Sequence, residues 1–251
     1  VAGRAVAAEA GRHLKKTMLE LGGSDPYLIL DDADIDVAAT GCVNGRMANA
    51  GQVCIAPKRC IVVPSVYEAF KARVLEQVSQ FCYGDPMRSD TRLGPLARHD
   101  LRDHLQQQVD DCVAQGARVL CGGEIPSGVG FYYPPTVIDG VVPGMPAYDE
   151  ELFGPVVSLI QAKDEADAIR IANDTCYGLG GGVFTQDLER GHAIATHGIN
   201  VGTCYVNTAV ASDPRFPIGG INASGYGREL TIEGVKEFLN IKVVCVKPSQ
   251  G

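Results

Sequence analysis

The chain lacks several features, and each absence excludes a class of protein. Its 251 residues contain no run of five or more basic residues and carry a formal net charge of −8 at pH 7. We therefore expect no nucleic-acid partner, because phosphate backbones are bound by clustered Lys and Arg. No stretch approaches the roughly 18 continuous apolar residues of a membrane span, and no basic segment followed by an apolar core opens the sequence. We expect neither a membrane span nor a signal peptide.

Paired cysteines are also missing. The nine cysteines are odd in number, scattered, and never spaced as C-x-x-C. A small secreted domain would join them as disulfides, and a structural zinc site would need closely spaced ligands. His192 and His197 lie five apart without the H-E-x-x-H pattern of a metalloprotease. We therefore expect reduced thiols in a cytoplasmic protein, and no metal site.

Strand-like and helix-like segments alternate along the chain, which predicts an α/β fold with a mostly parallel sheet flanked by helices. Strands are predicted at residues 27–30, 60–63, 118–121, 155–160 and 181–185. Helices are predicted at residues 1–17, 38–50, 65–78, 97–115, 165–173, 188–196 and 230–239, with Ser65 as the cap of the third. Residues 241–246 form an apolar segment that predicts a terminal edge strand. Because exposed edges are usually paired, we expect a subunit contact there, in a homodimer or homotetramer.

A thiol and a carboxylate stand in two short glycine-containing segments, Gly51-Gln52-Val53-Cys54 and Leu19-Glu20-Leu21-Gly22-Gly23. A thiol can attack an electrophilic carbon, and a carboxylate can activate the water that releases the product. Each residue alone has a plainer interpretation, because cysteine is among the most buried residue types and a Glu between leucines is more often solvated. The combination makes an enzyme the leading hypothesis, with Cys54 as nucleophile and Glu20 as base.

Together with two further motifs, these segments give the chain a resemblance to the aldehyde dehydrogenase superfamily over essentially its whole length. The further motifs are Glu150-Glu151-Leu152-Phe153-Gly154-Pro155 and Pro217-Ile218-Gly219-Gly220 with Ser224-Gly225-Tyr226-Gly227-Arg228-Glu229. Within the superfamily, residues 23–26 and 211–213 are most similar to bacterial NAD(P)-dependent succinate-semialdehyde dehydrogenases.

The resemblance implies a reaction and a set of residue roles. Cys54 would add to a small aldehyde to form a thiohemiacetal, which passes hydride to NAD or NADP and becomes a thioester. Glu20 would activate the water that hydrolyses this thioester. Glu151 and Phe153 would hold the nicotinamide ribose and pack near the nicotinamide ring. A thiol suits this chemistry, because a thioester is readily hydrolysed.

Family members are roughly twice as long as this chain, which resembles their carboxyl-terminal, catalytic half. The resemblance implies three parts: residues 1–22 as a remnant of the dinucleotide-binding domain, 23–228 as the catalytic domain, and 229–251 as a helix and oligomerisation strand. We expect the chain alone to be inactive, because most of the cofactor site belongs to the other half. Two alternatives stay open: a CoA-acylating semialdehyde dehydrogenase, and a non-catalytic oligomerisation module.

The substrate pocket departs from the succinate-semialdehyde pattern at one position. Some of these enzymes carry an arginine six positions before the nucleophile, where this chain has Ala48. An arginine there would hold the carboxylate of the substrate. Arg46 or Arg215 is hypothesised to take that role.

Overall fold

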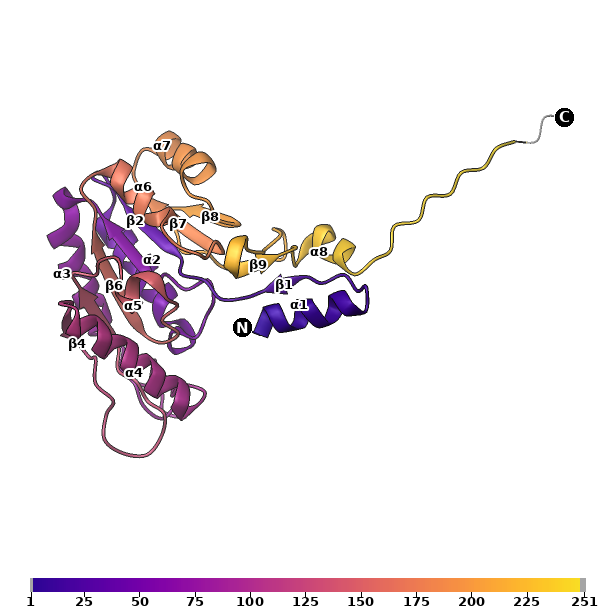
Figure 1. Ribbon diagram of the computed structural model, residues 1–251. Coiled ribbons are helices and arrows are strands. Elements are labelled where there is room, and N and C mark those ends of the chain that lie inside the picture. The colour runs from indigo at the N-terminus through magenta and orange to yellow at the C-terminus, as the bar shows by residue number, and fades with distance from the viewer. Residues whose placement is uncertain (1, 249–251) are drawn as a thin grey trace.

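A seven-stranded sheet organises the chain and confirms the predicted α/β class. In the computed structural model, which describes residues 2–248, the strand order is β4-β5-β6-β3-β2-β7-β8 (Figure 1). All neighbouring strands are parallel except β4 and β5. The strands are β2 (Pro26–Ile29), β3 (Arg59–Val62), β4 (Arg118–Cys121), β5 (Thr136–Asp139), β6 (Val156–Gln161), β7 (Gly180–Phe184) and β8 (Thr203–Val206).

The helices are α1 (Ala2–Arg12), α2 (Ile35–Met47), α3 (Tyr67–Val78), α4 (His99–Ala114), α5 (Pro146–Asp149), α6 (Glu165–Asn173), α7 (Leu188–Ala193) and α8 (Thr231–Glu237). Helices α2 to α7 lie in connections between strands of this sheet, as parallel pairing requires, whereas α1 precedes the sheet and α8 follows it in the chain. Asp34 caps α2, because its side chain accepts hydrogen bonds from the first-turn N–H groups of Asp36 and Val37. Within the described range, no helix is long and apolar enough to cross a bilayer.

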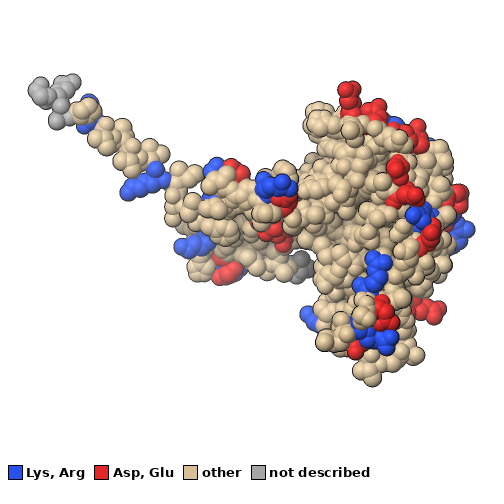
Figure 2. Space-filling model, turned by 180° about the vertical axis from the view of Figure 1, so that it is seen from behind, with Lys and Arg blue, Asp and Glu red and all other residues tan. Residues whose placement is uncertain are grey.

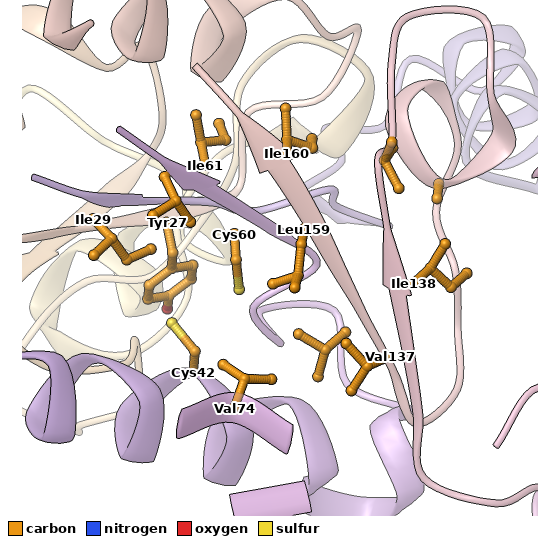
Figure 3. Packing of buried hydrophobic residues seen from close by; sticks show 14 of the residues in the cluster. Tyr27, Ile29, Cys42, Cys60, Ile61, Val74, Val137, Ile138, Leu159 and Ile160 are labelled. Carbon is orange, nitrogen blue, oxygen red and sulfur yellow. The ribbon is translucent and has the colours of Figure 1, made fainter. Parts of the chain in front are cut away.

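The central strands are buried on both faces, and this explains their continuous apolar sequences. Every residue of β2, β3 and β5 is buried, and successive side chains of a strand point to opposite faces. On one face, Cys42 of α2 and Val74 of α3 lie against the core strands, near Tyr27, Cys60 and Leu159 (Figure 3). The alternate residue Arg59 faces the other way and donates to carbonyls of α6.

A second, two-stranded sheet joins segments from the two ends of the chain. Strand β1 (Leu19–Glu20) pairs antiparallel with β9 (Gly225–Tyr226). The close approach requires glycine, because Gly225 has φ +114° and a Cβ there would lie 2.0 Å from the Leu19 carbonyl oxygen. This pairing fixes the backbone that carries Glu20.

Some local features differ from the predictions. Residues 240–248 contain neither helix nor strand and extend away from the rest of the molecule (Figure 1). The edge strand predicted over residues 241–246, which was expected to pair with another subunit, stays a prediction. A strand needs a ladder partner, and none of the described residues supplies one. Ser65 does not cap α3, because Pro64 starts a short 3₁₀ turn, Pro64–Val66, that leads into the helix. Strands β5 and β8 were not predicted.

Charged side chains of both signs are interspersed on the surface. On the face shown in Figure 2, no basic patch is continuous, in keeping with the acidic composition. Among residues 2–248, no three His, Cys, Asp or Glu side chains cluster as ligands for a metal ion. The nine cysteines are free thiols.

Candidate active site

A tight turn after α2 delivers the Cys54 thiol. Helix α2 continues into a 3₁₀ turn, Ala48–Gly51, in which Asn49 and Ala50 adopt left-handed backbone angles with φ of 49° and 52°. Gly51 follows with φ +75°, and a Cβ on it would lie 2.1 Å from the Gly154 carbonyl oxygen. Such backbone strain is tolerated where the surroundings impose it, and it concentrates at functional sites.

Arg46 ties this turn to the segment that follows α5. Its side chain is fully buried, and its guanidinium donates to the carbonyl oxygens of Gly51 (3.1 Å), Leu152 (2.7 Å) and Gly154 (3.0 Å from Nε). The structure does not support the hypothesis that Arg46 binds a substrate carboxylate, because the side chain is fully buried and its Nε and Nη2 donate to the backbone. Its Nη1 has no hydrogen-bond partner among the described residues. Arg215 is exposed and pairs with Asp213 at 2.6 Å.

The Cys54 thiol is half-buried. Burial raises its pKa above the ordinary value, and the nearby Glu20 carboxylate raises it further. The Lys58 ammonium and the N–H of Ile55 oppose these effects. The segment that follows Glu20 packs against the Cys54 turn, because a Cβ on Gly23 would lie 3.0 Å from the Cys54 carbonyl oxygen.

Glu20 has the properties of a base that works near neutral pH. Burial raises its pKa to about 6, the neighbouring Glu229 carboxylate adds to the rise, and the N–H of Gly220 opposes it. Its Oε1 atom is buried without a hydrogen-bond partner among the described residues. A general base is most effective when its pKa lies close to the working pH, so the position of Glu20 suits proton abstraction from a water molecule.

Glu151 stands on the wall of a neighbouring cavity of about 840 Å³. The cavity lies between α1, the segment around Gly22, and the loop that leads into β9; its lining includes Gly3, Leu21 and Tyr226. The N–H of Gly23 donates to Glu151 Oε1 at 3.0 Å. A Cβ on Gly22 would lie 2.1 Å from Glu151 Oε2, so glycine is required for the carboxylate to approach. Phe153 follows two residues later with 38% of its surface exposed.

Two buried ionisable residues near Cys54 were not predicted. Lys58 and Asp25 are each almost fully buried, and burial raises the pKa of Asp25 to about 6 against the opposing effect of Lys58. The sequence carried one signal for them, which is a charged residue directly before an apolar strand. Lys58 and Arg59 precede the apolar run that begins at Cys60, and Asp25 precedes the run that begins at Tyr27. Charged residues are rarely buried unless they are paired, so such positions indicate a buried ionic cluster.

Comparison with known proteins gives one family. The model of the aldehyde dehydrogenase family matches residues 1–244. The chain is 47% identical to the succinate-semialdehyde dehydrogenase [NADP(+)] 1 of Mycobacterium ulcerans, covering 98% of this chain and 53% of that protein. It is 46% identical to the succinate semialdehyde dehydrogenase [NAD(P)+] Sad of Escherichia coli, covering 97% and 52%.

Solved structures agree with this result. The betaine aldehyde dehydrogenase of Staphylococcus aureus in complex with NAD+ is 34% identical and superposes with a TM-score of 0.90, over 94% of this chain and 48% of that one. The chain thus spans about half the length of the relatives that it matches.

Proposed function

The chain belongs to the aldehyde dehydrogenase family, and from this membership we propose that it supplies the nucleophile and the base for NAD(P)-dependent oxidation of an aldehyde to its acid. The observation that carries the proposal is the half-buried Cys54 thiol with the Glu20 carboxylate beside it. Covalent catalysis by a thiol followed by hydrolysis needs this pair.

In the proposed reaction, the Cys54 thiolate adds to the aldehyde carbonyl and forms a thiohemiacetal. The backbone N–H of Cys54 would help to stabilise the developing oxyanion. When bound, a nicotinamide dinucleotide would accept the hydride of the thiohemiacetal, and Cys54 would then hold the acyl group as a thioester. Glu20 then removes a proton from water, the resulting hydroxide attacks the thioester carbonyl, and the acid leaves as the Cys54 thiolate is restored.

The residues of the cavity fit the ribose of a nicotinamide dinucleotide. Glu151 presents a carboxylate at the cavity wall, oriented by the N–H of Gly23, and a carboxylate accepts hydrogen bonds from sugar hydroxyl groups. We assign Glu151 to the ribose and the partly exposed Phe153 ring to the nicotinamide. The half-length coverage supports the further proposal that the chain alone binds the dinucleotide weakly and is inactive.

Succinate semialdehyde is the proposed substrate, because two relatives that are 46% and 47% identical carry that name. We place the protein in the cytoplasm and propose a homodimer or homotetramer. The apolar tail supports the assembly: Ile241, Val243, Val244 and Val246 are 72–91% exposed, and such a segment is stable in water when another strand covers it. Light scattering that finds only monomer would contradict the assembly.

Aldehyde oxidation tests the proposed function directly. The chain is completed with the amino-terminal half of the Escherichia coli relative, and NADPH or NADH formation from succinate semialdehyde is followed. We expect turnover that is abolished in Cys54→Ala and unchanged in the matched control Cys82→Ala, whose thiol is exposed. Normal oxidation by Cys54→Ala would overturn the assignment.

Product analysis with and without CoA distinguishes hydrolysis from acyl transfer to CoA. The presence of Glu20 favours free succinate, because acyl transfer to CoA needs no water-activating base. Calorimetry tests whether the cofactor site of this chain is incomplete, as the non-catalytic alternative requires. Tight, stoichiometric NAD binding by the 251-residue chain alone would contradict both the proposed weak binding and that alternative.

A further inference from the structure

A single buried ammonium lies beneath the nucleophile. Lys58 is 2% exposed, and its Nζ donates to the carbonyl oxygens of Cys54 at 2.7 Å and Val53 at 3.2 Å. The same Nζ lies 3.4 Å from Oε1 of Glu151. The proposed reaction does not use this lysine, although it contacts both the backbone of the nucleophile and the carboxylate assigned to the cofactor.

The surroundings of Lys58 explain how a charge is kept there. An ammonium group has three donors and no acceptor, and the two carbonyls and the carboxylate provide three acceptors. The pKa of Lys58 is lowered to about 8, first by burial and then by the Arg46 guanidinium, while Asp25 and Glu151 act in the opposite direction. The two carboxylates therefore help Lys58 to remain protonated near neutral pH.

We propose that Lys58 is a positioning residue, which holds the Cys54 backbone and the Glu151 carboxylate on one ammonium and stabilises the Cys54 thiolate. The inference rests on the proposed role of Cys54 as nucleophile. It adds a structural link between the thiol and the cofactor side of the site, so that displacement of either partner changes the position of the other.

The charges that face the thiol explain why such a cation matters. Glu20 faces Cys54 from β1, and Asp25 faces it from the segment before β2; both carboxylates disfavour the thiolate. Lys58 opposes them, while Arg46 and Glu151 face Lys58 itself. A thiolate forms readily only where positive charge compensates burial and neighbouring carboxylates.

The test is the pH dependence of Cys54 alkylation by iodoacetamide, resolved by mass spectrometry of the Cys54 peptide in the 251-residue chain. Lys58→Met removes the charge at nearly constant volume. We expect its alkylation rate at about pH 7, where Lys58 is protonated in the unmodified chain, to be about tenfold lower than that of the unmodified chain, and the difference to shrink above about pH 8, where Lys58 loses its proton. Lys58→Arg keeps a charge that persists above the Lys58 pKa, so its rate at about pH 7 should not fall. Lys236→Met serves as the matched control, because Lys236 is exposed and pairs only locally with Glu233.

The possible outcomes separate this inference from the proposed function. An alkylation rate of Lys58→Met at about pH 7 that equals that of the unmodified chain overturns the inference, provided that thermal unfolding shows a folded variant. If Lys58→Met does not fold, Lys58→Arg decides: a rate about tenfold lower at about pH 7 despite the retained charge overturns the inference. A Cys54 thiol that is not alkylated in the unmodified chain contradicts the proposed nucleophile, and the inference fails with it.

Discussion

Replacement of Glu20 by Gln should stop the reaction at the acyl-enzyme stage. The step can be isolated without a cofactor by using p-nitrophenyl acetate, an activated ester. The Cys54 thiolate attacks the ester carbonyl, p-nitrophenolate leaves, and an acetyl thioester remains on the sulfur. Water then hydrolyses the thioester with Glu20 as the base, so the rate of deacylation reports on Glu20 alone once the acylated chain has been separated from excess ester.

The size of the effect follows from the role and the pKa of Glu20. Loss of a general base slows a step by about 10²- to 10⁴-fold, and Glu20→Gln should reduce deacylation by that factor. With a pKa of about 6, the ionised fraction of Glu20 rises from about 0.1 at pH 5 to about 0.9 at pH 7. Deacylation of the unmodified chain should therefore accelerate about tenfold over this range, whereas a carboxyl group with the ordinary pKa of 4.5 would change it by only about 1.3-fold.

Two controls exclude loss of structure as the cause. Glu76→Gln changes an exposed glutamate of α3 and should leave deacylation unchanged. Glu20→Gln should not lower the free energy of unfolding at pH 7: because the folded-state pKa is raised, ionisation of Glu20 reduces stability as the pH rises through about 4.5 to 6. Equal deacylation rates in Glu20→Gln and the unmodified chain, or a flat profile between about pH 5 and 7, would refute the reasoning.

Three further substitutions test the surroundings of the site. Glu229→Gln removes a charge that raises the pKa of Glu20, so the midpoint of the deacylation profile should fall by about half a pH unit; an upward shift would contradict this. Gly51→Ala places a Cβ against the Gly154 carbonyl at φ +75° and should lower the free energy of unfolding in urea by at least about 2 kcal/mol; an unchanged midpoint would mean that the turn relaxes freely. Arg46→Leu leaves three carbonyl oxygens without their buried donor. It should lower the free energy of unfolding in urea by about 3 to 5 kcal/mol. A decrease below about 1 kcal/mol would contradict the structural role of Arg46.

The α/β fold could be predicted because the strands that form the core are short, apolar and separated by helical periodicity. Helix α6 begins and ends where predicted, at Glu165 and Asn173. Strand β8 was missed because it is only half-buried and its sequence, Thr203–Val206, carries little apolar contrast with its surroundings. Strand β5 directly follows the Pro134-Pro135 pair, and proline is rare inside strands, so this part of the sequence carries little strand signal.

The candidate site was predictable where one residue type determines the chemistry. Cys54 and Glu20 stand in recognisable segments. The structure places the segment after Glu20 against the Cys54 turn, at Gly23, and the pairing of β1 with β9, which joins positions about 200 residues apart, holds the backbone of Glu20. The role of Arg46 was not predictable, because sequence gives neither the depth of a side chain nor its acceptors. The same limit applies to Lys58, which contacts the nearby backbone carbonyls of Val53 and Cys54 and the distant Glu151 carboxylate.

The terminal tail shows a different limit. Residues 241–246 have the apolar character of a strand, and strand propensity depends strongly on the surface against which the segment packs. The hydrophobicity of a segment indicates that another surface covers it, but does not identify whether that surface belongs to the same chain or to another one. Within residues 2–248 the tail has no ladder partner, so its pairing depends on a surface outside this part of the chain.

The most direct test of the central claim is the site of acylation in Glu20→Gln. The variant is treated with p-nitrophenyl acetate, digested, and analysed by mass spectrometry of all nine cysteine-containing sites. We predict one stable acetyl group on Cys54, which the unmodified chain loses by hydrolysis. Acetylation of a different cysteine, or a Cys54 adduct that is hydrolysed equally fast in both proteins, would contradict a nucleophile and base formed by Cys54 and Glu20.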